Sequence, residues 1–167
     1  MSRAYVYRHR VTFDETNLVG NVYFAHYLHW QGHCREHFLA DHAPGVLDAL
    51  GDGLALVTVS CAVEFHAEAR AHDRVEVAMT LAQVAGNRIA MRFAYRRESG
   101  ELLAVGDQTV AVMRRVADGL APAPLPEDLR RALDRFADRF ADRFADRFAP
   151  DGAARVDQSA GSTAVAR

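Results

Sequence analysis

Hydrophobic and polar positions alternate along much of the chain, which predicts β-strands. The predicted strands cover residues 4–13, 54–70, 73–85, 88–98 and 102–115. Gly86-Asn87 and Ser99-Gly100 have the composition of tight turns between strands. We therefore expect the last four strands to form an antiparallel meander. Uninterrupted alternation along the second strand places Thr58 and Cys61 on opposite faces.

A different spacing occurs between the first two strands, in the stretch Asp14–His42. Its large apolar residues recur every three or four positions, which predicts an α-helix about five turns long. These residues are Phe24, Tyr27, Leu28, Cys34, Phe38 and Leu39. Asn21 is the candidate N-cap, because its side-chain oxygen can accept a backbone N–H of the first turn. The sheet must cover its apolar face, so we expect an α+β fold in which a curved antiparallel sheet wraps around this helix.

The pattern changes after residue 118 and divides the chain into three predicted segments. Residues 1–118 form one domain, residues 119–149 form a proline-containing linker and a C-terminal helix, and residues 150–167 form a disordered tail. Within the helix, Asp-Arg-Phe-Ala recurs between residues 134 and 149. Two interpretations stay open. The phenylalanine stripe binds a partner or another copy, or it extends a packed helix.

Composition and charge narrow the functional classes. The net charge of -2 gives no electrostatic basis for binding nucleic acid or an anionic membrane. The first residues lack the apolar segment of a signal peptide, and the uncharged run 53–63 is too short to span a bilayer. Cys34 and Cys61 indicate neither a disulfide framework nor a zinc site. We expect a cytoplasmic protein without cofactor or metal, since the histidines of the helix have no identifiable third ligand.

The loop and the start of the helix resemble a known family. The run FDETNLVGNVYF at residues 13–24, followed by Tyr27-Leu28 and Trp30, resembles the motif of hot-dog-fold acyl thioesterases of the 4-hydroxybenzoyl-CoA type. Residues 17–27 together with Cys34-Arg35-Glu36 are more similar to the thioesterases of enediyne polyketide pathways. The resemblance implies a single hot-dog domain and the hydrolysis of acyl thioesters.

One position within this resemblance, which covers residues 5–115, changes the expected chemistry. Where the hydroxybenzoyl-CoA enzymes carry a catalytic aspartate, this chain has Asn17. An amide can be neither base nor nucleophile at neutral pH, which excludes carboxylate catalysis by that position. The enediyne branch implies that Asn17 acts with a helix arginine, here Arg35. It also implies a β-ketoacyl polyene thioester, held on the acyl carrier domain of an iterative polyketide synthase, and a β-keto acid product that can lose carbon dioxide.

The chemistry expected at this site is electrostatic. Thioester hydrolysis places negative charge on the carbonyl oxygen, which the Asn17 amide and the backbone N–H of Phe24 can stabilise. Arg35 lies seven residues after Leu28 and so nearly on the same helical face, where its charge needs a partner. That partner is the β-keto oxygen, the product carboxylate or Asn17. A structural ion pair with Glu36 of a neighbouring chain is the alternative.

Further candidates for binding substrate each have a structural alternative. They are Tyr27, Gly20, Thr58 and Glu36. Tyr27 can equally be a core aromatic, whereas Glu36 is the second candidate base because related enzymes place a carboxylate on this helix. The acidic residues Asp14, Glu15 and Glu64 are interpreted as lying in a turn or on a strand surface.

The resemblance also implies an oligomer, and it leaves other functions open. Protomers of the family pair into dimers, commonly tetramers, with Asn17 of one chain and Thr58 or Glu64 of the other at a shared site. The alternatives are a general acyl-CoA thioesterase of the same fold, a non-catalytic acyl-binding or scaffolding partner of a synthase, and a hot-dog dehydratase. The dehydratase is disfavoured because residues 14–21 lack the histidine that it needs.

Overall fold

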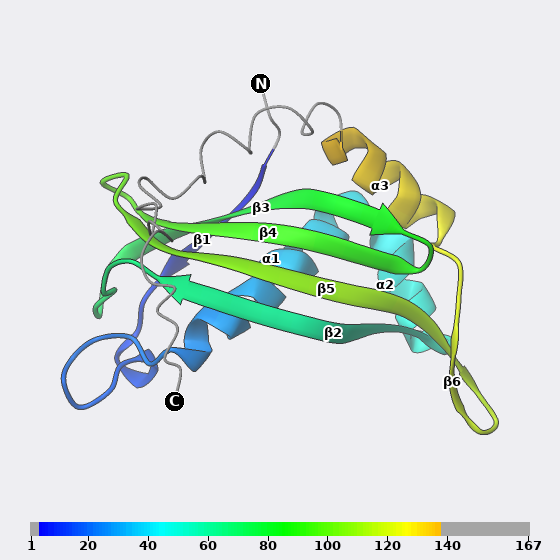
Figure 1. Ribbon diagram of the computed structural model, residues 1–167, viewed down its shortest axis with the longest axis horizontal. Coiled ribbons are helices and arrows are strands. Elements are labelled where there is room, and N and C mark those ends of the chain that lie inside the picture. Colours follow the sequence, from blue (N-terminus) through cyan, green and yellow to red (C-terminus); the bar gives the residue numbers. More distant parts are fainter. Residues whose placement is uncertain (1–3, 138–167) are drawn as a thin grey trace, which may run out of the picture.

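The computed structural model describes residues 4–137 and shows a curved antiparallel sheet around one long helix (Figure 1). The strands are β1 (Tyr5–Arg10), β2 (Leu54–Phe65), β3 (Arg74–Ala85), β4 (Arg88–Arg97), β5 (Leu102–Val116) and β6 (Gly119–Pro122). The helices are α1 (Ala25–His42), α2 (Pro44–Gly51) and α3 (Glu127–Ala137), with a short 3-10 turn, η1, at Phe13–Glu15. The predicted α+β fold is confirmed.

The strands lie in the order β1-β3-β4-β5-β2, and β6 pairs with β5. Strands β3, β4 and β5 form a meander, but β2 pairs with β5 and not with β3 (Figure 1). The prediction of a four-strand meander was therefore wrong for β2, which was expected to pair with β3. The connection over residues 66–73 is not a tight hairpin turn, so it can carry the chain across the sheet to β3. As a result β2 forms one edge of the sheet.

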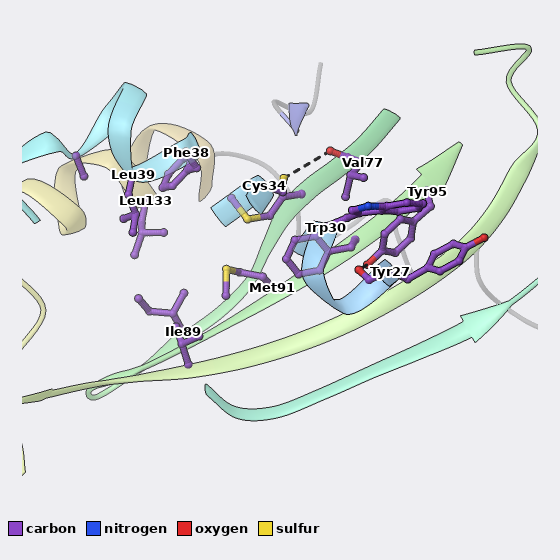
Figure 2. Close-up of a cluster of buried hydrophobic side chains, with 14 of the residues drawn as sticks. Tyr27, Trp30, Cys34, Phe38, Leu39, Val77, Ile89, Met91, Tyr95 and Leu133 are labelled. Carbon is purple, nitrogen blue, oxygen red and sulfur yellow. Dashed lines mark hydrogen bonds between the residues drawn. The ribbon is translucent and has the colours of Figure 1, made fainter. Parts of the chain in front are cut away.

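The long helix α1 packs on the sheet through one buried stripe. The buried residues of the stripe are Tyr27, Trp30, Gln31, Cys34, Phe38 and Leu39. Figure 2 shows it against side chains of the sheet that include Val77, Met91 and Tyr95. Trp30 is fully buried at the centre of this core. The helical spacing in the sequence therefore identified the packed face at Tyr27, Cys34, Phe38 and Leu39, whereas Phe24 is exposed and Leu28 is only half-buried.

The start of α1 differs from the prediction. The helix begins at Ala25, with Phe24 at the N-cap position and no side-chain cap hydrogen bond. The prediction that Asn21 caps the helix was wrong, because Asn21 forms a β-bridge with Arg70 and its Nδ2 donates to Glu68 Oε1 at 3.2 Å. This pairing with the segment after β2 holds Asn21 away from the helix and leaves the first helical N–H groups without a side-chain cap.

A β-bulge changes which residues of β2 face the core. The register with β5 skips one residue between Thr58 and Ser60, so that Thr58 is opposite Val110 and Cys61 is opposite Gln108. Directly opposed residues of an antiparallel pair share a face. Because Val110 and Gln108 are both buried, Thr58 and Cys61 point to the same, helix-covered face of the sheet. The prediction of opposite faces was wrong because alternation stops at the bulge.

The segment after β5 returns to the core. The expected linker begins as β6, and α3 then packs through Leu129 and Leu133, which are buried. Phe136, the first phenylalanine of the repeat, packs edge-on against Phe38, with ring centroids 5.1 Å apart. For this residue the packed-helix interpretation is correct. The later repeat phenylalanines and the predicted tail lie outside the described residues.

Candidate active site

Asn17 begins a tight turn in the loop between η1 and α1. Its backbone N–H donates to Asn21 O and its carbonyl accepts the Gly20 N–H, each at 2.9 Å. Gly20 has a φ of 87°, a conformation that favours glycine, so this residue allows the turn to close. The side-chain Oδ1 of Asn17 accepts the Val19 N–H at 3.1 Å. Because this backbone donor occupies the amide oxygen, the Nδ2 hydrogens point away and can donate to a ligand.

A cleft of about 470 Å³ lies beside this turn and includes the start of α1. Its lining includes Asn17, Tyr23, Phe24, Tyr27, His66 and Glu68. No acceptor within residues 4–137 takes the backbone N–H of Phe24, and the positive end of the helix dipole lies at the same place. The Asn17 side chain and the Phe24 backbone therefore line one cleft in which neutral donors are available.

A buried carboxylate, that of Glu15, anchors the loop from beneath. It accepts hydrogen bonds from His9 Nε2, the Thr12 backbone N–H and Trp30 Nε1, each at 2.8 Å. The backbone carbonyl of Glu15 accepts the Tyr23 N–H at 2.9 Å. Burial by itself raises the pKa of this carboxyl, but the hydrogen bonds from Thr12, His9 and Trp30 bring the pKa down to about 2. Glu15 is thus an ionised structural anchor. It lies in the turn η1, as its interpretation as a turn residue expected, but its side chain is buried.

The sequence contains a signal for this anchor. Thr12 and Glu15 have the T-x-x-E spacing of a capping box, in which the acidic side chain accepts the backbone N–H of the first residue. The two other partners, His9 and Trp30, come from β1 and α1. Their convergence depends on tertiary packing, and so the local spacing indicates only part of the network.

Arg35 lies further along α1 and is half-buried. Its Nη1 donates to Gln108 Oε1 at 3.0 Å, and its buried Nε has no hydrogen-bond partner among residues 4–137. Burial lowers the pKa of Arg35, an effect that the charge of Glu36 opposes. Arg35 lines an apolar cavity of about 30 Å³ between α1, α3 and the sheet. It also lines a surface cleft of about 500 Å³ between α1, α2 and β2.

The other candidates occupy different environments. Tyr27 is 2% exposed, lines the cleft beside Asn17 and packs edge-on against Phe65, with ring centroids 5.0 Å apart. Glu36 is exposed and lines the surface cleft that contains Arg35. Thr58 is exposed at the edge of the sheet and lines none of these spaces. Gly20 shapes the turn without lining the cleft.

Two expected partners are separated within one protomer. Asn17 and Phe24 share one cleft, whereas Arg35 lines a cavity and a second cleft that contain neither of them. The cleft beside Asn17 also contains His66 and Glu68, which the sequence analysis did not single out. Glu68 bonds to Asn21 and pairs with Arg70 at 3.3 Å, so its carboxylate already has partners.

Neither a membrane-spanning helix nor a metal-binding cluster is present among residues 4–137. No helix between residues 4 and 137 is both long and apolar enough to cross a membrane. Over the same residues, no three His, Cys, Asp or Glu side chains gather in a way that could hold a metal ion.

The fold, together with similarity to known proteins, identifies the chain as a hot-dog thioesterase, an enzyme that hydrolyses thioesters. The chain belongs to the thioesterase-like superfamily, which it matches over residues 11–133. It is 66% identical to the dynemicin thioesterase, with a TM-score of 0.79, over 80% of this chain and 97% of that chain. That protein is described as showing induced-fit and allosteric effects upon polyene binding. The predicted family resemblance is confirmed.

More distant structures share the fold. A 1,4-dihydroxy-2-naphthoyl-CoA thioesterase from Synechocystis is 24% identical over 81% of this chain and 98% of its own, with a TM-score of 0.71. A 4-hydroxybenzoyl-CoA thioesterase complexed with 4-hydroxybenzoyl-CoA is 17% identical over 79% of this chain and 99% of its own, with a TM-score of 0.70. The chain matches no curated protein.

Proposed function

We propose that this thioesterase hydrolyses a β-ketoacyl polyene thioester held on the acyl carrier domain of an iterative enediyne polyketide synthase. The observation that carries the proposal is the 66% identity to the dynemicin thioesterase, a protein that binds a polyene. Water oxygen bonds to the carbonyl carbon, the carbon–sulfur bond breaks, and the carrier thiol leaves with a proton. The product is a β-keto acid that can then lose carbon dioxide.

In the proposed mechanism the transition state is stabilised by donors and not by an attacking carboxylate. Asn17 and Phe24 line the same cleft, and the Asn17 Nδ2 and the Phe24 N–H would hold the oxygen of the tetrahedral intermediate. One well-aimed donor of this kind contributes about 2.7–4 kcal/mol. Tyr27 forms the apolar wall of the cleft, and water is the nucleophile because a thioester is already an activated acyl group.

Two copies of the chain would complete the site. Within one protomer Asn17 and Arg35 line different spaces, so a shared site needs Asn17 of one protomer and Arg35 of the other. The Asn17 turn exposes Leu18 and Val19, and the edge strand β2 exposes Val59 and Phe65. Exposed apolar side chains next to an unpaired strand edge are suited to a dimer interface. Dimers of this kind can pair further into a tetramer.

The substrate proposal is tested by mass analysis of the products released from a loaded iterative synthase. The expected result is a β-keto acid or the methyl ketone that forms after loss of carbon dioxide. Steady-state rates on carrier-linked β-ketoacyl chains are compared with rates on short acyl-CoA esters. Faster turnover of the CoA esters would instead indicate a general acyl-CoA thioesterase. If no product is released from either substrate, the protein is a non-catalytic acyl-binding partner.

A subunit-mixing experiment tests the shared site. Asn17→Ala and Arg35→Ala proteins are each inactive alone in this proposal, and the two are mixed under conditions that allow subunit exchange. A mixed dimer then has one site with both native residues and one site with neither. Activity should return to about one quarter of the parental value at random exchange, because half of the dimers are mixed and each has one intact site. Mixtures that stay inactive although mixed dimers form would place both residues in one protomer's site.

A further inference from the structure

Arg35 is half-buried on α1, and its hydrogen-bond partner is uncharged. Buried ionised groups usually have an opposite charge or several hydrogen-bond partners, and the Glu15 carboxylate accepts hydrogen bonds from His9, Thr12 and Trp30. Arg35 makes no ion pair with any carboxylate among residues 4–137. A neutral amide, that of Gln108, accepts from its Nη1 instead. The charge of the guanidinium is therefore not cancelled by its protein partner.

A chain of two buried amides fixes that contact. Gln108 Nε2 donates to Gln31 Oε1 at 3.4 Å, and Gln31 Nε2 donates to the Ala62 carbonyl on β2 at 3.3 Å. Since each amide nitrogen has an acceptor, each amide oxygen must face the next donor along the chain. The oxygen of Gln108 is thereby directed to Arg35. Gln31 is fully buried and Gln108 is 6% exposed, so water does not compete easily for these bonds.

The space around Gln31 is closed on its far side by Gly106. A Cβ built on Gly106 would lie 3.0 Å from the Ala62 carbonyl oxygen and still nearer to Gln31 Nε2. Gly106 lies opposite Val63 on β2 and opposite Phe93 on β4. The absence of a side chain at this point of β5 therefore gives the Gln31 amide the room that it occupies.

The surroundings of Arg35 indicate which kind of ligand its guanidinium could bind. Its buried Nε has no partner, and the cavity beside it is lined by apolar side chains that include Phe38, Met91 and Leu133. The surface cleft on its other side contains Glu36, His33 and His37. A guanidinium between an apolar cavity and an open cleft suits an oxyanion attached to an aliphatic or polyene chain.

We propose that Gln108, oriented by Gln31, is a positioning residue that holds Arg35 without neutralising it, so that the guanidinium binds the anionic oxygen of an acyl ligand. This inference deepens the proposed function and rests on its assignment of Arg35 to the site. A carboxylate at position 108 could still accept from the guanidinium, although it could not donate to Gln31, and it would compete with the ligand for the charge of Arg35. The proposal therefore requires that the hydrogen-bond acceptor next to Arg35 be uncharged. An acceptor that carries a negative charge would not serve.

The Gln108→Glu variant separates these two properties. Its side chain can still accept from Arg35, and the new ion pair should offset the hydrogen bond to Gln31 Oε1 that a carboxylate cannot donate, so that the protein still folds. Its kcat on a thioester substrate should nevertheless fall about 10²-fold, the size of effect seen when one transition-state donor is removed. The matched control is Gln83→Glu on the exposed part of β3, which adds the same charge and should leave kcat unchanged.

Binding of a simple carboxylate supplies a readout that does not depend on turnover. Octanoate and its neutral counterpart 1-octanol are titrated into each protein by calorimetry. The Gln108→Glu variant should bind octanoate about tenfold more weakly than the parent, with the affinity for 1-octanol unchanged. Parental octanoate affinity and parental kcat in a folded Gln108→Glu protein would overturn the proposal. Equal weakening for both ligands would also overturn it, because that result indicates a general packing defect.

A second variant keeps the proposal testable if Gln108→Glu does not fold. Gln108→Leu removes the acceptor without adding a charge, so Arg35 loses its orientation and octanoate affinity should fall about threefold to tenfold. Parental affinity in this variant would show that the amide does not position Arg35.

The two proposals fail separately. If the parent does not cleave carrier-bound β-ketoacyl chains while octanoate binding depends on Gln108 as described, only the substrate proposal is wrong. If cleavage occurs as proposed but Gln108→Glu retains parental kcat and octanoate affinity, only the positioning role is wrong.

Discussion

The loop that carries Asn17 and the core segment that carries Arg35 are held by opposite kinds of contact. Beneath the loop lies the ionised carboxylate of Glu15, which accepts hydrogen bonds from β1, the turn and α1. Arg35 instead donates to the neutral amide of Gln108, which is bonded in turn to the neutral amide of Gln31. In the loop the charged group is the support, and the proposed functional group is the neutral amide of Asn17. In the core the proposed functional group is the charged Arg35, and its support is neutral.

This difference has a physical reason. A buried carboxylate with several donors is held strongly, which suits an anchor that takes no part in binding. A guanidinium that must bind an anion cannot also be paired with a carboxylate, because the ligand would have to displace that pair. The predictions below test whether the two regions really differ in this way, beginning with the largest expected effect.

The first prediction concerns the donor in the loop. Asn17→Ala should lower kcat by about 10²–10³-fold, because it removes one donor to the developing oxyanion. Asn17→Asp retains an oxygen for the Val19 N–H and so preserves the turn, but it removes the donating hydrogens. Both variants should therefore be slow in steady-state assays and should fold. If the aspartate variant is as fast as the parent, the electrostatic mechanism is wrong and a carboxylate can act at this position.

The second prediction concerns the charged anchor. Glu15→Gln places an amide NH₂ against groups that already donate, so the free energy of unfolding should fall by about 3 kcal/mol. Urea unfolding at fixed protein concentration measures the change. The control is Glu98→Gln, whose carboxylate makes an exposed pair with Arg74 and should contribute less than about 1 kcal/mol. A loss as small as that of the control would show that Glu15 does not anchor the loop.

The same carboxylate predicts a pH dependence of stability. Its pKa is about 2 in the folded protein against an ordinary value of 4.5. A lowered folded pKa means that its contribution is complete above the unfolded pKa and is lost as the pH falls from about 4.5 towards 2. Thermal unfolding between these pH values should show the parent losing more stability than Glu15→Gln. Parallel curves for the two proteins would contradict this assignment.

A smaller effect is expected at Gly106, behind the neutral support. Gly106→Ala should displace the Gln31 amide, destabilise the protein by about 1–2 kcal/mol and lower kcat several-fold. The control is Gly32→Ala on α1, where a new Cβ meets nothing within 4 Å and should stabilise the helix by up to about 1 kcal/mol. The melting temperature and kcat of both variants are measured and compared with those of the parent. Equal behaviour of the two variants would remove the argument that Gly106 makes room for Gln31.

The smallest effect is expected at Glu68. This carboxylate lines the Asn17 cleft, but it is bonded to Asn21 and Arg70. Glu68→Gln should change kcat by less than about threefold, whereas loss of a general base typically costs 10²–10⁴-fold. A loss in the larger range, in a protein that still folds, would assign general-base catalysis to Glu68. The mechanism without a catalytic carboxylate would then be wrong.

The sequence by itself determined the elements that depend on local periodicity. Alternation located the strands, helical spacing located α1 and its buried Cys34 and Phe38, and the motif around Asn17 indicated the family. Such features can be predicted because each depends on residues that are close together in the sequence. The T-x-x-E spacing of Thr12 and Glu15 belongs to the same class, although its meaning appeared only in the structure.

Only the tertiary structure decided how distant residues combine. It paired β2 with β5, turned Cys61 to the core face through a bulge, and joined Gln31 to Gln108 across 77 positions of the sequence. It also separated Asn17 from Arg35 within one protomer. No local pattern specifies these contacts, because strand partners and buried amide pairs are selected by the packing of the whole core.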